Sequence, residues 1–85
     1  MAWKITWSMD AIRTLSKMEK PVAKRVLAKI EQAATDPHHH TTRLAGSADF
    51  KLRAGDIRIL MLLNSSKKTM YIQAIGNRRN IYKKR

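Results

Sequence analysis

The chain has 85 residues, no cysteine and a formal net charge of +12. These values predict one small domain over 1–85 and exclude disulfides and thiolate metal sites. No apolar run approaches the roughly 20 residues of a membrane span. The first residues lack the apolar core of a signal peptide, so we expect a cytoplasmic protein.

The positive charge is concentrated in the second part of the chain. Eight basic and five acidic residues lie in 1–49, and ten basic residues with one acidic residue lie in 50–85. The net charge is therefore +3 in the first part and +9 in the second. This asymmetry favours a nucleic-acid surface in the C-terminal part. An acidic protein partner, or simply a basic soluble surface, would account for the same composition.

Alternating apolar and polar residues predict a first strand over 3–7. Trp3, Ile5 and Trp7 share one face of this strand. We interpret the two tryptophans as core residues rather than as a platform on which bases stack.

Two helices are expected to follow as a helical hairpin. Apolar residues at helical spacing predict a short helix over 9–18, with Ser8 as its N-cap. Pro21 fits the first turn of a second helix. That helix is expected to end near Thr35, because the residue before Pro37 is disfavoured in the α conformation.

Three consecutive histidines follow the second helix, at positions 38–40. Consecutive residues cannot all converge on one ion from a regular element, and no cysteine or carboxylate follows at ligand spacing. We therefore expect an exposed turn at His38, His39 and His40, and we predict neither a metal site nor a cofactor.

The stretch 50–63 predicts a β-hairpin that turns at Gly55-Asp56, because glycine accepts the positive φ of such turns. This turn sets Arg53 opposite Arg58. Side chains alternate between the two faces of a strand. The predicted core face carries Phe50, Leu52, Ile57, Ile59 and Met61, and the other face carries Lys51, Arg53, Arg58, Leu60 and Leu62.

The second of these faces brings three cations together. Like charges directly opposite each other destabilise a hairpin, so an anion is the natural occupant of such a site. A further strand is predicted over 69–75, with Met70, Ile72 and Ala74 on one face. A two-residue turn at Ser65-Ser66 would place Gln73 beside Arg58.

The predicted order is strand, helix, helix, strand, strand, strand. This is an α+β fold of two layers, with an N-terminal strand, a helical hairpin and a three-stranded antiparallel meander. The helices would cover one face of the sheet and leave the cationic face open.

The chemistry available to this face is limited by what the sequence lacks. There is no cysteine, the acids form no close pair, and no glycine-rich phosphate loop precedes a helix. Lysine, arginine and Tyr82 remain, and such a set can support transfer of an RNA phosphodiester to the neighbouring 2′-OH. Arginine stabilises the charged phosphorane, and lysine can act as a base when nearby cations lower its pKa.

Several segments in order resemble the RelE/ParE superfamily of type II toxin–antitoxin toxins, and most closely its RelE-like branch. The first and second helices of that family resemble 11–18 and 20–27. Arg43-Leu44-Ala45-Gly46 resembles the step before its core strands, and 50–58 resembles its aromatic-basic-x-Arg-x-Gly-Asp signature. Gly76-Asn77-Arg78-Arg79-Asn80-Ile81-Tyr82 resembles its closing pattern.

The resemblance implies a metal-independent endoribonuclease that cuts mRNA on the ribosome and leaves a 2′,3′-cyclic phosphate. The implied roles are that Lys51 acts as a base or electrostatic stabiliser and that Arg58 and Arg78 hold the phosphate, while Tyr82 orients the nucleotide. The residues implied to bind the RNA backbone are Arg53, Arg79, Lys83 and Lys84. The identity of the general base stays open.

The resemblance also implies partners: the ribosome, mRNA and an acidic antitoxin that covers or displaces the face formed by Lys51, Arg58 and Tyr82. The toxin–antitoxin complex would bind operator DNA through the antitoxin. The alternatives are a ParE-type inhibitor of DNA gyrase with the same fold and no nuclease activity, or a non-catalytic basic RNA-binding protein. Arg58 in a structural ion pair, a solvated basic tail and Tyr82 packed on the sheet edge are the corresponding structural interpretations.

Overall fold

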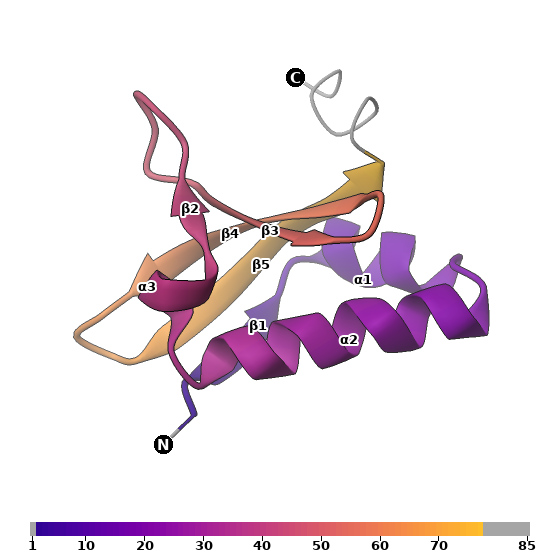
Figure 1. The fold of residues 1–85 in the computed structure, drawn as a ribbon, viewed down its shortest axis with the longest axis horizontal. Coiled ribbons are helices and arrows are strands. Elements are labelled where there is room, and N and C mark those ends of the chain that lie inside the picture. Colours follow the sequence, from indigo (N-terminus) through magenta and orange to yellow (C-terminus); the bar gives the residue numbers. More distant parts are fainter. Residues whose placement is uncertain (1, 78–85) are drawn as a thin grey trace.

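The computed structural model describes residues 2–77, and the remaining residues, 1 and 78–85, lie outside it. Two longer helices lie on the same side of a twisted sheet, and a short helix and strand lie at one end of it (Figure 1). The elements in chain order are β1 (Lys4–Trp7), α1 (Met9–Ser16), α2 (Lys20–Ala34), α3 (Pro37–His40), β2 (Thr42–Arg43), β3 (Phe50–Ala54), β4 (Ile57–Asn64) and β5 (Thr69–Asn77).

The five strands form one mixed sheet in the order β1-β5-β4-β3-β2. β1 is parallel to β5, and the other neighbouring pairs are antiparallel. The predicted two-layer α+β fold with a helical hairpin and an antiparallel meander is therefore confirmed. α3 and β2 were not predicted, because the sequence indicated only an exposed turn at 38–40 and no strand between that turn and Phe50.

The helices begin where local chemistry favours them. The Ser8 side chain caps α1 by accepting a hydrogen bond from the Ala11 backbone N–H at 2.9 Å. Pro21 lies in the first turn of α2, and this helix ends at Ala34 with Thr35 as its C-cap, as predicted. α1 ends at Ser16, two residues before the predicted end.

The core lies between the helices and the sheet. Its fully buried large side chains come from α2, α3, β4 and β5, and Trp3, Ile5 and Trp7 pack against it half-buried. The interpretation of both tryptophans as core residues is confirmed. The largest fully buried side chains are Val26, Ile30, Pro37, Ile59, Met61, Met70 and Ile72.

The β3–β4 hairpin has the predicted register. Gly55 in its turn has a φ of +62°, which is a conformation that glycine adopts without strain. Leu52 pairs with Ile59 on the buried face, and Arg53 pairs with Arg58 on the open face. The division of this hairpin into a core face and an open face is therefore confirmed.

A β-bulge in β5 corrects two expectations about the last strand. Met61 pairs with Ile72 but Leu60 pairs with Ala74, so Gln73 is the extra residue. Beyond the bulge the faces exchange, and Ile75 rather than Ala74 is buried. Gly76, not Gln73, lies beside Arg58, because the turn after β4 has four residues rather than two and the bulge shifts the register by one more.

Ser8 also fixes the bulge. Its hydroxyl donates to the Gln73 carbonyl at 2.7 Å, and its backbone N–H donates to the Ile72 carbonyl at 2.9 Å. One side chain therefore serves as the helix cap and satisfies a carbonyl that the irregular strand leaves available.

We expect Ser8→Ala to lower the free energy of unfolding by about 1–2 kcal/mol, because both the cap and the bond to the bulge are lost. Ser16→Ala is the matched control, since the exposed Ser16 hydroxyl bonds only to the nearby Arg13 carbonyl. Urea unfolding followed by circular dichroism measures both variants. Equal stability of the two would contradict the role given to Ser8.

Candidate functional site

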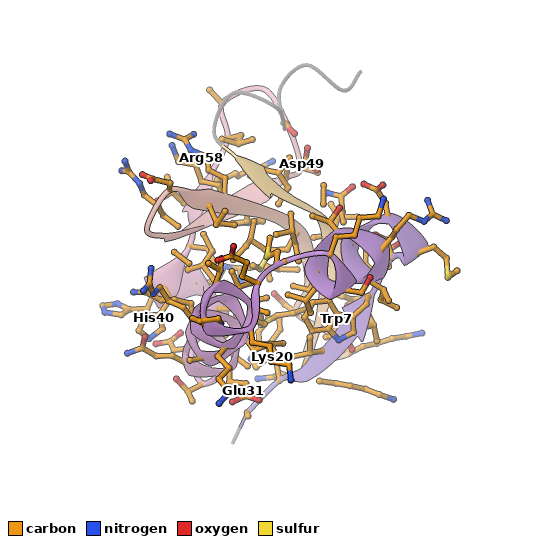
Figure 2. All side chains as sticks on the ribbon, turned by 90° about the vertical axis from the view of Figure 1, so that its right-hand side faces the viewer. Trp7, Lys20, Glu31, His40, Asp49 and Arg58 are labelled. Carbon is orange, nitrogen blue, oxygen red and sulfur yellow. The ribbon has the colours of Figure 1, made fainter. Side chains whose placement is uncertain are left out.

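The face of the sheet turned away from α2 carries the candidate site. Figure 2 shows Arg58 and Asp49 on one side of the strands, whereas Lys20 and Glu31 of α2 lie on the other. We call this surface the open face. Paired positions on β3, β4 and β5 form rows across it: Arg53, Arg58 and Gly76, then Lys51, Leu60 and Ala74, then Leu62 and Tyr71.

The first row places two cations directly opposite each other. Arg53 is exposed and Arg58 is half-buried, and they occupy paired positions on neighbouring strands. Directly opposed side chains in an antiparallel pair have Cβ atoms about 5 Å apart. On its β5 side Arg58 lies next to Gly76, which has no side chain. Lys51, half-buried in the adjacent row, adds a third positive charge to the same face.

This arrangement suits an anion with several oxygen atoms. Two guanidinium groups on adjacent strands present planar pairs of donors, and phosphate accepts such pairs in bidentate fashion. The predicted grouping of Lys51, Arg53 and Arg58 on one face is confirmed by the register of the strands.

A polar pair that the sequence analysis missed crosses the same face. The Gln73 side-chain amide donates to the Asp49 carboxylate at 2.6 Å. Asp49 directly precedes β3, and its backbone N–H is held by the Ser47 hydroxyl at 3.0 Å. The pair fixes a negative charge on the open face. The sequence predicted Gln73 on the cationic face but beside Arg58, and it gave no signal for the pairing with Asp49.

A groove of about 300 Å³ opens at the edge of β3, and it shares Lys51, Arg53 and Arg58 with the open face. We call it the edge groove. Its other lining residues are Leu52 on β3, Lys29 and Gln32 on α2, His40 on α3 and Thr42 on β2. None of the described residues that line it is acidic, so its field is strongly positive.

The three histidines have different surroundings, although they are consecutive. The exposed His38 ring packs edge-on against the rings of Trp3 and Phe50, with 5.7 Å between ring centroids in each pair. His39 is exposed. His40 is half-buried and lines the edge groove. The expected exposed turn is thus a short helix, and one of its histidines belongs to the site.

Several residues assigned to the site lie outside the described residues. These are Arg78, Arg79, Tyr82, Lys83 and Lys84. Within 2–77, no group of three or more histidine, cysteine, aspartate or glutamate side chains is arranged to hold a metal ion. Over the same residues, no helix has the length and apolarity that crossing a membrane requires.

Comparison with known proteins identifies the architecture but not the sequence family. No protein-family model matches the chain, and no curated protein is similar to it in sequence. Solved structures do match it in three dimensions.

The RelBE2 toxin–antitoxin complex of Mycobacterium tuberculosis contains a chain that superposes with a TM-score of 0.81 at 18% identity, covering 92% of this chain and 100% of that one. A chain of the RelE–RelB complex of Pyrococcus horikoshii has a TM-score of 0.79 at 18% identity, covering 94% of this chain and 99% of that one. The YoeB/ParE toxin of Agrobacterium tumefaciens has a TM-score of 0.74 at 12% identity, covering 87% of this chain and 96% of that one. The chain therefore has the RelE/ParE-like toxin fold.

Proposed function

We propose that this protein is the toxin of a type II toxin–antitoxin system and that it cleaves mRNA bound to the ribosome. One observation carries the proposal: Arg53 and Arg58 face each other beside Lys51 on the uncovered face of a RelE-like sheet. Opposed like charges do not themselves stabilise a hairpin, and a polyanionic ligand would give this pair a function.

The chemistry follows from what these side chains can supply. The 2′ oxygen of the RNA attacks the neighbouring phosphorus, the bond to the 5′ oxygen breaks, and that oxygen receives a proton. The products are a 2′,3′-cyclic phosphate and a 5′-hydroxyl. Arg58 stabilises the charge that develops on the phosphorane, since guanidinium keeps its charge and binds two oxygens. Lys51 serves as the base that accepts the 2′ proton or as a second electrostatic stabiliser.

The remaining roles rest on the resemblance to RelE-like toxins. Arg78 would hold the same phosphate as Arg58, and Tyr82 would orient the nucleotide. The RNA backbone would be gripped by Arg53, Arg79, Lys83 and Lys84. The reaction proposed here uses neither a metal ion nor a cofactor.

The proposal includes an antitoxin partner. The similar chains from M. tuberculosis and P. horikoshii come from toxin–antitoxin complexes. The net charge of +12 suits an acidic toxin-binding segment in such a partner. We propose that the antitoxin inhibits by covering or displacing the face that holds Lys51 and Arg58, and that the complex binds operator DNA through the antitoxin.

The purified protein is expected to cut mRNA in a ribosome complex but not the same RNA free in solution. Primer extension maps the cuts, and end-group analysis should find a 2′,3′-cyclic phosphate at each. Addition of EDTA should leave the rate on preformed ribosome complexes unchanged while those complexes remain intact.

A folded protein that cuts no RNA on ribosomes would refute the nuclease proposal. Inhibition of gyrase in a supercoiling assay, by the same preparation, would then identify a ParE-type toxin. RNA binding without either activity would leave a basic RNA-binding protein.

A further inference from the structure

The edge groove contains a histidine and a lysine that the proposed reaction does not use. We propose that this groove is a second RNA-backbone site, in which His40 and Lys29 hold a phosphate next to the one bound on the open face. The identity of the ligand as RNA rests on the proposed function.

The geometry makes the groove continuous with the open face. β2 pairs only with Phe50 and Lys51 of β3, so the edge of β3 from Leu52 onwards has no strand partner among the described residues. Lys51, Arg53 and Arg58 line the groove as well as the open face. A strand of RNA that leaves the open face can therefore pass over this edge toward α2 without leaving positive potential.

His40 is held in place by its own short helix. Pro37 is buried, and its carbonyl accepts from the Thr41 backbone N–H at 3.0 Å and from the Thr41 hydroxyl at 2.7 Å. His38 fastens the same turn to the aromatic rings of Trp3 and Phe50. A rigid support of this kind directs His40 toward the groove (Figure 2 labels it beside α2).

The charges around His40 come from α2, β3 and β4, whereas β2 contributes the uncharged Thr42. Lys29 faces the groove from α2, and Lys51 and Arg53 from β3, together with Arg58 from β4. The centroids of the His39 and His40 rings are 5.2 Å apart. An anion in this groove would therefore lie among four cationic side chains and the His40 ring.

The polarity of the groove favours an RNA backbone over a folded partner. Of the described lining residues, only Leu52 is apolar. Protein interfaces usually centre on apolar and aromatic anchors, which this groove lacks.

The test measures binding of a 2′-O-methyl RNA hexanucleotide, which the protein cannot cleave because the attacking hydroxyl is blocked. His40→Gln should weaken binding by up to about tenfold, because the ring that lines the groove and its hydrogen bond to the phosphate are lost. His40→Lys should restore binding, because it supplies a cationic donor at the same position. His39→Gln is the matched control and should behave as wild type.

A second pair of variants tests Lys29. Lys29→Gln should reduce the slope of log affinity against log salt by about 0.7, the value for one phosphate contact on a single strand. Lys24→Gln, on the same helix but outside the groove lining, should leave the slope unchanged. Thermal melting verifies that each variant is folded.

The proposal is overturned if His40→Gln and Lys29→Gln bind like their controls, even when the protein cleaves mRNA on ribosomes. Failure of the folded wild type to bind the hexanucleotide, or tighter binding of a hexaglutamate peptide in the groove, overturns it equally. If the variants behave as expected but no mRNA is cut, the groove proposal stands and the nuclease proposal alone fails.

Discussion

Arg58→Ala is expected to reduce ribosome-dependent mRNA cleavage by at least about 10²-fold, because one preorganised charge at the reacting phosphate is worth that much or more. Arg58 is the central position of the row that it forms with Arg53 and Gly76, so it has a neighbour on each adjacent strand. The initial rate of cleavage at a single mapped site, with saturating ribosomes, is the quantity to compare.

Two further variants sharpen this test. Arg58→Lys keeps the charge but loses the planar pair of donors, so its rate should fall between those of the wild type and the alanine variant. Arg13→Ala removes an exposed arginine from α1, which contributes no residue to the open face, and should leave the rate unchanged. A well-folded Arg58→Ala protein with the wild-type rate would exclude Arg58 from the reaction.

Ile59→Ala should produce the opposite result, a loss of stability rather than of chemistry. Ile59 is fully buried on the central strand β4, between Leu52 on one side and Ile75 on the other. Truncating such a residue costs about 2–5 kcal/mol, and a domain of this size has only about 5–15 kcal/mol in total. We expect a large decrease in the urea midpoint or a protein that is largely unfolded at 37 °C.

Leu62→Ala is the matched control on the same strand. Leu62 is 37% exposed and points to the open face, so its truncation should cost about 0.5 kcal/mol or less. Ile59→Val, which removes one methylene, should cost about 0.5–1.5 kcal/mol and keep the protein folded for measurement. If Ile59→Ala and Leu62→Ala were equally stable, the assignment of buried and open faces would be wrong.

The sequence predicted the hairpin of the site because local chemistry determines it. A glycine with positive φ sets the turn, and strict alternation on either side sets the register, so the pairing of Arg53 with Arg58 follows. Alternation did not predict β5 correctly, because apolar residues occur on both faces of that strand. The bulge at Gln73 is held by Ser8, which lies 65 residues away in the chain.

The edge groove could not be predicted for a related reason. Its lining comes from α2, α3, β2, β3 and β4, and periodicity says nothing about how those elements meet. The spacing of the histidine run gave no indication that His40 lines a groove together with Lys51. The side chains placed by a single hairpin could be predicted from the sequence, whereas those brought together by tertiary packing could not.

The parallel pairing of β1 with β5 has a consequence for folding during synthesis of the chain. Lys4 pairs with Thr69 and Trp7 with Ile72, so the first strand has no partner in the sheet until the last described strand has been synthesised. Closing so long a loop is entropically costly, and folds dominated by distant contacts form slowly. The complete sheet therefore cannot assemble before β5 has been synthesised, and the N-terminal strand must wait for it.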